Sequence, residues 1–413
     1  MQMENLSAIA YYVTDKISSN DVSLQEYVTT DCILQNKKGR EIATNLPPQP
    51  CSLIRYQRGD VLIANIRPYL KKIWFADIDG GASSDVLVFR AKDGHHPSFL
   101  YAILLQDSFF DYVMLGAKGS KMPRGDKDQI LRYEMPTLSC SEESIGTFFL
   151  NIDYKIRLNE QINQNLESMA KQLYDYWFVQ FDFPNEEGKP YKSSGGKMVW
   201  NEQLKKEIPA GWRCGTLLDI AEFTNGLACQ KFRPTDNNKL PVIKIKEMHD
   251  GISSETEFVK SDIPENVKVY DGDVLFSWSA SLEVMLWVHG NGGLNQHIFK
   301  VTSKNGYPRS FYYYQLVDYN NSFKRIAEAR KTTMGHITQD HLRQSTIALP
   351  SNIDITNKLE KILSPIFELI MRNSQEIMSL TRLRDELLPL LMNGQVSVNS
   401  DLSACRTIGR YSS

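Results

Sequence analysis

The amino-acid sequence predicts an α+β fold in which two duplicated domains are separated by two long helices that form an antiparallel coiled coil. The first observation is an internal repeat, because GDVLIAN at 59–65 recurs as GDVLFSW at 272–278, which is 272 − 59 = 213 residues later. The second is a heptad pattern of apolar residues after each copy of the repeat. The third is that strand-like runs precede an aromatic helical stretch in each copy.

The repeat extends over most of each copy. Further segments recur in the same order at similar offsets, among them 6–15 with 217–226, 80–90 with 292–300, 99–113 with 310–326, and 119–136 with 332–350. A shared order at a nearly constant offset is typical of a duplicated structural unit. We therefore expect a first domain at 1–140 and a second at 213–350.

Each copy is predicted to combine strands with a helical region. Runs of β-branched and aromatic residues bounded by Gly, Asp or Pro read as strands, such as DVLVFR at 85–90 and PVIKIK at 241–246. The spacing of aromatic residues predicts helices at 99–113 and 310–326. The irregular stretch at 32–52 suggests a surface loop, where binding residues often lie.

A heptad pattern predicts the two long helices. Its a positions are Ile145, Ile152, Asn159, Leu166 and Leu173 in the first stretch, and Leu359, Ile366, Asn373, Leu380 and Leu387 in the second. Its d positions are Phe148, Lys155, Ile162, Met169 and Tyr176, then Ile362, Leu369, Glu376, Leu383 and Leu390. The expected order is a central helix at 141–182, a linker at 183–212, a distal helix at 351–398 and a tail at 399–413.

Polar residues and a proline within these helices carry further information. Asn159 and Asn373 share the a position and lie 373 − 159 = 214 residues apart. A buried a-position Asn fixes register and partner number at some cost in stability; alternatively, each lies at a wet edge of a short helix pair. Pro365, with Ser364 as its cap, predicts a break or a new start in the distal helix.

The composition is that of an ordinary globular protein. The chain has 413 residues, 42% hydrophobic and 23% charged, with a formal net charge of −2. Any affinity for DNA must therefore come from local charge. Six cysteines are scattered without a C-x-x-C pair, and no apolar run is long enough to span a bilayer. We expect a cytoplasmic protein with reduced cysteines.

Motifs of catalysis are not found with the spacing that their chemistry needs. No G-x-x-x-x-G-K-[ST] phosphate loop is present. Two partial matches are better explained as loop and linker residues: NLPPQ at 45–49, where Leu46 interrupts a methyltransferase-like tetrapeptide, and Glu187-Gly188-Lys189 with Asp182. Neither His95-His96 nor His336 with His341 has the spacing of a zinc site. We expect no catalytic site, no metal and no cofactor in this chain.

Several segments resemble the DNA-specificity (S) subunits of type I restriction-modification systems. The passage NEQINQNLESMAKQLYDYWFVQFDFP at 159–184, followed by IPAGW at 208–212, is similar to their central region. Segments 13–19, 58–77 and 117–127 resemble one class of their N-terminal target-recognition domain, and 382–398 resembles their distal helical region. The resemblance runs from residue 1 to about 398, in the expected order.

This resemblance implies a non-catalytic function. Each target-recognition domain would read one half of a split, asymmetric sequence in double-stranded DNA. The coiled coil would set the spacing of the halves and dock two methyltransferase (modification) subunits, which two restriction (motor-nuclease) subunits can join. S-adenosylmethionine would bind the methyltransferase subunit, and ATP and magnesium the restriction subunit.

Basic residues at corresponding places in the repeat are the candidate DNA contacts. They are Lys118, Lys121, Arg124 and Lys127 with one acid, Asp126; and Lys324, Arg325, Arg330 and Lys331 with one acid, Glu328. Each cluster nets 4 − 1 = 3 positive charges. A third group is Arg67, Lys71 and Lys72 beside Trp74, mirrored less well by Trp278 and Trp287. Candidate base readers are Arg67, Arg124 and Arg330, with Asn65, Ser83 and Asn295 as polar alternatives.

Two other functions stay open at this point. The chain could be an orphan or type II-like specificity subunit, which the same residues would fit. It could also be a coiled-coil scaffold whose duplicated domains bind protein, an interpretation favoured by the nearly neutral net charge. Against the scaffold stand the two corresponding basic clusters, although any one of these cations could be an ordinary solvated surface charge.

Overall fold

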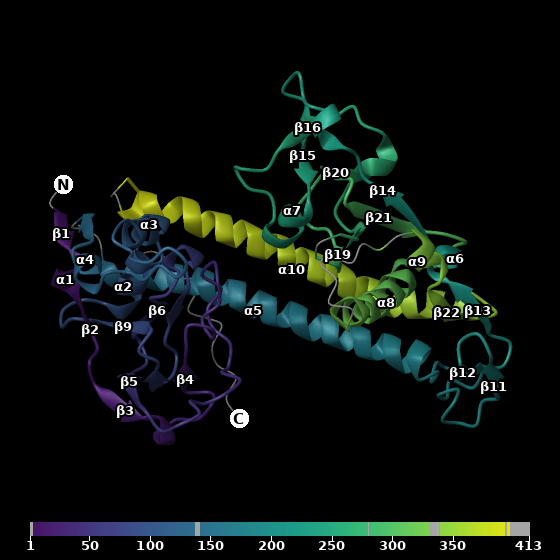
Figure 1. The fold of residues 1–413 in the computed structure, drawn as a ribbon, viewed down its shortest axis with the longest axis horizontal. Helices are drawn as coiled ribbons and strands as arrows, with labels where there is room; N and C mark the ends of the chain where they lie inside the picture. Colours follow the sequence, from purple (N-terminus) through teal and green to yellow (C-terminus); the bar gives the residue numbers. More distant parts are fainter. Residues whose placement is uncertain are drawn as a thin grey trace. The chain divides into compact units, whose positions relative to one another are not determined.

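The structure, a computed structural model, contains two units that each hold one copy of the repeat (Figure 1). The first unit comprises residues 1–159 and 377–413, and the second comprises 160–376. The structure describes residues 3–136, 141–279, 281–329, 337, 339–392 and 395–396. Within these ranges, none of the helices combines the length and apolarity that a bilayer-spanning segment requires.

The first unit is built on two four-stranded sheets. Its main sheet has the antiparallel order β2 (Ala10–Tyr12), β9 (Val86–Ala91), β6 (Val61–Ala64) and β7 (Ile73–Phe75). The other sheet has the order β3 (Lys16–Ser18), β5 (Ser52–Tyr56), β8 (Gly80–Ala82) and β4 (Tyr27–Val28). β1 (Met3–Asn5) pairs with β10 (Glu134–Pro136). The run VLIA of β6 is buried throughout, as expected for an apolar inner strand.

The second unit repeats this plan. Its main sheet has the order β14 (Ala221–Asn225), β21 (Ile298–Ser303), β18 (Val274–Ser277) and β19 (Glu283–Leu286). The other sheet has the order β16 (Phe258–Lys260), β15 (Lys239–Ile243), β20 (Gly292–Leu294) and β17 (Lys268–Val269). β13 (Arg213–Thr216) pairs with β22 (Thr346–Leu349).

The strand register confirms the duplication that the sequence predicted. Val61 of β6 lies opposite Phe89 of β9, and Val274 of β18 lies opposite Val301 of β21. These pairs differ by 274 − 61 = 213 and 301 − 89 = 212 residues, which are the offsets of the sequence repeat. Because register decides which side chains face the core, the two copies share one packing frame.

The copies differ at the edge of their second sheet. In both, a central strand (β8 or β20) pairs in parallel with one neighbour (β4 or β15) and antiparallel with another (β5 or β17). The fourth strand then joins on opposite sides, because β3 pairs with β5 whereas β16 pairs with β15. The shared frame therefore presents different surfaces in the two units.

Helices are present where the aromatic spacing predicted them, at 99–113 and 310–326, together with shorter helices that were not predicted. The first unit has α1 (Leu6–Ile9), α2 (Pro97–Leu104), α3 (Asp107–Leu115) and α4 (Lys127–Ile130). The second has α6 (Leu217–Ile220), α7 (Ile245–Asp250), α8 (Arg309–Ala329) and α9 (Gln339–Arg343). The single helix expected at 99–113 is divided, because Gln106 is extended (ψ 143°) between α2 and α3.

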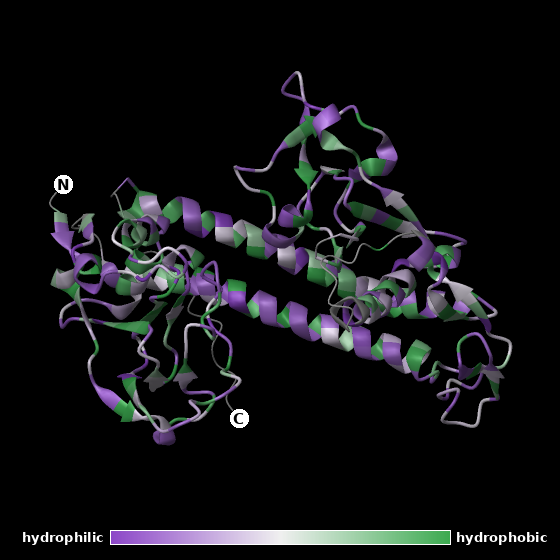
Figure 2. Ribbon diagram, viewed as in Figure 1, coloured by the Kyte–Doolittle hydropathy of each residue, from purple (hydrophilic) through white to green (hydrophobic). Residues whose placement is uncertain are grey.

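Both long helices are present, and the predicted a positions of the heptad pattern are correct. They are α5 (Glu142–Tyr174), which continues as a π-helical turn at Asp175–Val179, and α10 (Asp354–Met392). All ten predicted a positions are buried or half-buried. Hydrophilic and hydrophobic residues alternate along both helices, as an amphipathic helix requires (Figure 2).

Eight of the ten predicted d positions are wrong, because the second buried row lies one residue later in each helix; the other two, Phe148 and Ile162, are half-buried. This row contains Phe149, Ile156, Asn163 and Ala170 in α5, and Leu363, Ile370, Arg384 and Leu391 in α10. The predicted d residues Lys155, Met169, Tyr176, Ile362, Leu369, Glu376, Leu383 and Leu390 are exposed. Residues i+3 and i+4 both lie on the same helix face as residue i, and apolar residues occupy both rows. The heptad pattern alone therefore does not distinguish the buried row from the exposed row.

The two helices pair antiparallel, as predicted. Asp153 of α5 contacts Arg384 of α10 in the first unit (3.7 Å), and Asn163 contacts Asn373 in the second (3.0 Å). Residue numbers rise along one helix while they fall along the other. Both units therefore contain a stretch of each helix.

The predicted polar residues Asn159 and Asn373 are both buried. Asn373 donates from Nδ2 to Oδ1 of Asn163, whose own Nδ2 donates to the Ile370 carbonyl (3.2 Å) and to Ser374 Oγ (3.0 Å). Asn163, which the heptad pattern did not predict as a core position, is thus the partner of Asn373. A satisfied polar pair in an apolar seam favours one register over its alternatives.

The expected break at Pro365 does not occur, because α10 runs without interruption from Asp354 to Met392. The Asn352 side chain accepts from the Asp354 backbone N–H (2.9 Å) and starts the helix eleven residues earlier, 365 − 354 = 11. Pro365 is exposed. Its ring removes one helical hydrogen bond, but the carbonyl that loses this bond is not buried by the proline.

The stretch at 183–212, predicted as a linker, is ordered. Phe183 stacks on Tyr191 (4.7 Å between centroids) and on Trp212 (5.3 Å). The strands β11 (Met198–Asn201) and β12 (Lys206–Pro209) form a hairpin within it. Aromatic stacking therefore closes this stretch into a small folded element of the second unit.

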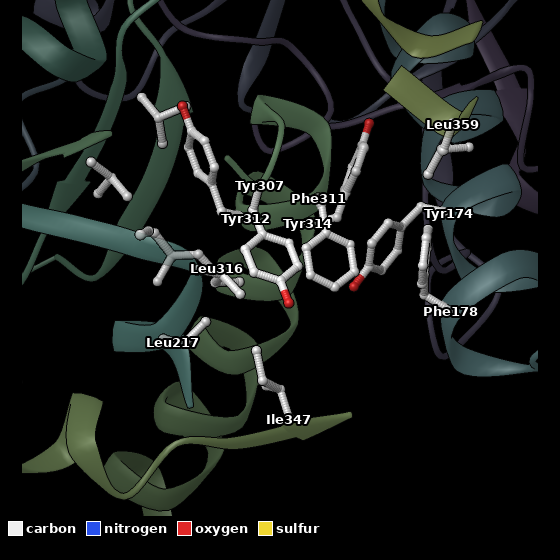
Figure 3. Packing of buried hydrophobic residues seen from close by; sticks show 14 of the residues in the cluster. Tyr174, Phe178, Leu217, Tyr307, Phe311, Tyr312, Tyr314, Leu316, Ile347 and Leu359 are labelled. Carbon is white, nitrogen blue, oxygen red and sulfur yellow. The ribbon is translucent and has the colours of Figure 1, made fainter. Parts of the chain in front are cut away.

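Aromatic residues join the end of α5 to the second domain (Figure 3). Tyr174 and Phe178 face the helix α8, with ring centroids 5.1 Å from Tyr314 and 4.9 Å from Phe311, respectively. All four side chains are buried. Aromatic residues from the end of α5 and from α8 thus fill one core.

Candidate nucleic-acid interface

Three loops of the first unit meet beside the end of β6. The Arg67 backbone N–H donates to the Pro123 carbonyl (2.8 Å), and that of Gly125 donates to the Asn65 carbonyl (3.3 Å). The Asn65 N–H donates to the Asp85 carbonyl (2.9 Å). The structure therefore brings together Arg67 and the basic cluster at 118–127, which the sequence placed in separate candidate groups.

The cations of these loops face solvent. Arg67, Lys118, Lys121, Arg124 and Lys127 are all exposed, Lys118 at 84% of its side chain and Arg124 at 58%. We call these five side chains the basic surface. With the acids in contact with them, Asp85 and Asp126, the local charge is 5 − 2 = 3 positive in a chain whose net charge is −2.

The acids at the basic surface leave its cations available. Lys118 pairs with Asp126 (3.1 Å) and Arg124 with Asp85 (3.2 Å). Solvent screens exposed pairs of this kind, so they contribute little and a phosphate can replace the carboxylate. The Gln129 backbone N–H and the Lys118 ammonium lower the pKa of Asp126, which therefore stays ionised.

Lys71 and Lys72, also predicted as DNA contacts, have partners within the first unit. Lys71 Nζ lies 2.8 Å from Asp107 Oδ1, and Lys72 Nζ donates to the Thr30 carbonyl (2.6 Å). Both side chains are half-buried. Trp74 beside them is buried, with the Arg40 guanidinium 4.3 Å above its ring. These contacts hold the loop in place and leave Arg67 as its exposed cation.

The second unit has the same loop frame. Trp278 N–H donates to the His297 carbonyl (3.3 Å), and Ile337 N–H donates to the Trp278 carbonyl (3.0 Å). These bonds correspond to those of Asn65 and Gly125, at 278 − 65 = 213 and 337 − 125 = 212 residues. Lys324 and Arg325 are exposed on α8, whereas the predicted contacts Arg330 and Lys331 lie outside the described residues.

The polar alternatives for base reading differ in how free their side chains are. Asn295 is buried; its Oδ1 accepts from the His297 N–H (3.2 Å), and its Nδ2 faces Cys229 Sγ (4.0 Å). Ser83 and Asn65 are half-buried. Trp287 is buried, whereas the indole N–H of Trp278, which is half-buried, donates to Asn225 Oδ1 (3.2 Å).

Asp85 was not singled out from the sequence. Its position after the Gly80–Gly81 pair, which corresponds to that of His297 in the second copy, could have drawn attention to it.

Two of the partial catalytic motifs make structural contacts, and His336 of another lies outside the described residues. Asp182 accepts from the Ser193 N–H (2.7 Å) and hydroxyl (2.6 Å), and Glu187 pairs with Lys189 on the surface. His95 and the His96 N–H both bind Glu142 at the start of α5. Among the residues that the structure describes, no three or more His, Cys, Asp or Glu side chains are grouped to hold a metal ion.

Comparison with known proteins identifies relatives over nearly the whole chain. Residues 209–382 match the family model described as the type I restriction modification DNA specificity domain. The MjaIX specificity subunit of a type I restriction enzyme from Methanocaldococcus jannaschii is 25% identical over 397 residues, covering 92% of this chain and 86% of the relative. The HindI specificity subunit from Haemophilus influenzae is 23% identical over 466 residues, covering 95% and 98%.

A solved structure has a similar fold. The crystal structure of a type I restriction-modification S subunit from M. genitalium superimposes with a TM-score of 0.58 at 12% identity, and the superposition covers 94% of each chain. At that identity the likeness concerns the fold alone. Two domains with two long helices are therefore an arrangement that this chain shares with a solved S subunit.

Proposed function

Because the chain belongs to the family of DNA-specificity subunits of type I restriction-modification systems, we propose that it recognises a split, asymmetric sequence in double-stranded DNA and docks methyltransferase and restriction subunits. Its relatives are specificity subunits, not enzymes. The chain accordingly supplies recognition, and the methylating and cleaving sites belong to other chains of the complex.

The observation that carries the proposal is the basic surface. Five exposed cations from two distant stretches of sequence are held together by backbone hydrogen bonds between Arg67 and Pro123 and between Gly125 and Asn65. Phosphates attract such a surface whatever the net charge of the chain. Its two arginines, Arg67 and Arg124, also have the fork of donors that can read a guanine edge.

The duplicated architecture supports a bipartite target. Each unit has the same loop frame, so each can present its loops to DNA in a similar way. The loop residues and the edge strands β3 and β16 differ between the units. Different side chains on one frame favour two different half-sites, hence an asymmetric sequence.

The outer faces of the long helices support docking of partner subunits. Tyr154 (68% exposed) and Met169 (59%) on α5 are uncovered apolar side chains. On α10 the exposed side chains Ile362, Leu369, Leu383 and Leu390 fall in a seven-residue series that only Glu376 interrupts. Such a row on a helix is typical of a surface that packs against another protein. The family resemblance points to two methyltransferase subunits there, which two restriction subunits can join.

Removing charge from the basic surface tests the proposal. In the triple variant Lys121→Gln, Arg124→Gln and Lys127→Gln, we expect the slope of log affinity against log salt to fall by about 3 units, since each lost phosphate contact removes about 0.9. Binding to cognate and unrelated duplexes should weaken together. Fluorescence anisotropy at several salt concentrations measures both quantities.

A matched control removes the same charges elsewhere in the first unit. Lys16→Gln, Lys38→Gln and Arg55→Gln replace two lysines and one arginine that are also exposed. We expect this variant to keep most of the salt slope. Equal slopes in the two triple variants would show that the basic surface does not hold DNA.

A further inference from the structure

The loop that carries Arg67 has a backbone that needs outside support. Arg67 (φ 55°) and Lys71 (φ 50°) flank a short 3-10 turn at Pro68–Leu70, and both are in the left-handed region without being glycine. L-residues disfavour this conformation, and it persists where surrounding contacts fix it. Strained loop residues of this kind often occur at binding sites.

Asp107 supplies that support from the first turn of α3. Its Oδ1 lies 2.8 Å from Lys71 Nζ and 2.8 Å from Lys37 Nζ. Lys37 is 5% exposed and also left-handed (φ 62°), and its N–H donates to the Lys71 carbonyl (3.0 Å). Burial alone would raise the pKa of Asp107, but the two lysines lower it, so the carboxylate stays charged.

The same ion pairs connect the loop to the long helices. Lys37 Nζ lies 3.5 Å from Asp385 Oδ1 on α10. Asp385 accepts from the neighbouring Arg384 (3.0 Å), which is buried and contacts Asp153 of α5 (3.7 Å). A continuous set of charges therefore runs from the Arg67 loop through Asp107 to both helices.

We propose that Asp107 is a positioning residue for DNA recognition, which holds the Arg67 loop against the helices so that Arg67 reaches the first half-site at a fixed place. This inference rests on the proposed function. Asp107 does not need to touch DNA, because it acts through Lys71 and Lys37. Without the Asp107 carboxylate the loop would be more mobile. Ordering the Arg67 guanidinium on DNA binding would then cost free energy.

The direction of the change in DNA affinity distinguishes a positioning role of Asp107 from a purely electrostatic effect. Removing an acidic residue near a DNA-binding surface ordinarily strengthens binding, because the phosphates are then repelled less. A positioning role predicts the opposite for the cognate duplex. Asp111 is the matched control, since it is an exposed acid four residues later in α3, 111 − 107 = 4.

The experiment compares Asp107→Asn, Asp111→Asn and Asp107→Glu in the full chain bound to its methyltransferase subunits. We expect Asp107→Asn to weaken cognate binding about tenfold and to lose discrimination at one base pair of the first half-site, as for the loss of one base contact. Unrelated duplexes should bind equally or more tightly, and the second half-site should be read as before. Asp107→Glu should restore part of the discrimination, and Asp111→Asn should lose none.

Other outcomes are informative. If Asp107→Asn behaves like Asp111→Asn, the positioning role is wrong, whereas a wild-type complex that prefers no duplex would instead overturn the proposed function. Should Asp107→Asn fold poorly by circular dichroism, Lys71→Gln breaks only the contact to the loop. Unchanged discrimination in that variant would also overturn the inference.

Discussion

Replacing Asp153 by asparagine is expected to lower the free energy of unfolding of the first unit by about 3–5 kcal/mol. Asp153 is 2% exposed and forms an ion pair with Arg157 one helical turn later. It also accepts from the Tyr101 hydroxyl (3.0 Å) of α2 and lies 3.7 Å from Arg384. One carboxylate therefore joins the first domain to both long helices.

The size of this effect follows from what the substitution leaves behind. Arg384 is 4% exposed, so loss of the Asp153 charge leaves a buried guanidinium whose remaining ion-pair partner, among the residues that the structure describes, is Asp385. Burial, together with the Asp153 charge, raises the pKa of Tyr101, which stays protonated and able to donate. Breaking one member of such a group costs more than the group contributes as a whole, because uncompensated charge stays buried.

Urea-dependent hydrogen exchange at peptides of β6 reports the unfolding of the first unit separately from the second. Asp93→Asn is the control, since Asp93 is an exposed aspartate in a surface turn of the same unit. We expect the control to change the unfolding free energy by less than about 0.5 kcal/mol. A similarly small change for Asp153→Asn would mean that the buried charges are not coupled as the contacts indicate.

Phe311→Ala should lower the free energy of unfolding of the second unit by about 3–5 kcal/mol. Phe311 is fully buried, with ring centroids 4.9 Å from Phe178 and 5.4 Å from Tyr307 (Figure 3). Alanine would remove most of the buried ring and leave a cavity where α8 meets the end of α5. The second domain should then loosen from the helix before the sheets unfold.

Hydrogen exchange at peptides of β18 and of the end of α5 measures this loss. Phe258→Ala is the matched control, because Phe258 belongs to the same unit and is 37% exposed, under the Lys239 ammonium (4.2 Å). We expect less than about 1 kcal/mol for it. Equal losses for the two phenylalanines would contradict the assignment of Phe311 to a shared core.

The duplication could be predicted from the sequence because both copies need glycine at the same closely packed positions. A Cβ on Gly80 would lie 2.2 Å from the Glu26 carbonyl oxygen, and one on Gly292 would lie 2.6 Å from Ile243 Cγ1. No other residue fits at either position without a shift, so the glycine pair and the apolar strand after it stay recognisable in both copies.

The second row of the helix core could not be predicted in the same way. Ile362 and Leu363 are adjacent, and either could face the neighbouring helix by spacing alone. The true row also contains a charged residue, Arg384, and its contacts with Asp153 and Asp385 make it acceptable in the interior. Tertiary partners decide such positions, and they lie too far away in the sequence to be read from a heptad.

The sequence predicted which residues are candidate DNA contacts, but it did not predict which of them lie together. Arg67 joins the cluster at 118–127 through backbone hydrogen bonds between loops about 50 residues apart, 118 − 67 = 51. Lys71 and Lys72 looked equivalent to Arg67 until their partners Asp107 and Thr30 were known. Their roles toward DNA, like those of the whole basic surface, stay predictions.

We propose that this chain selects the DNA sequence for a methyltransferase. The most direct test is single-molecule sequencing for methyladenine in a methylation-free host that expresses the chain with a methyltransferase subunit of the same system. We predict one split, asymmetric motif, methylated only when both proteins are present. If the two proteins form a complex and the host DNA carries no such motif, the chain does not act as a specificity subunit.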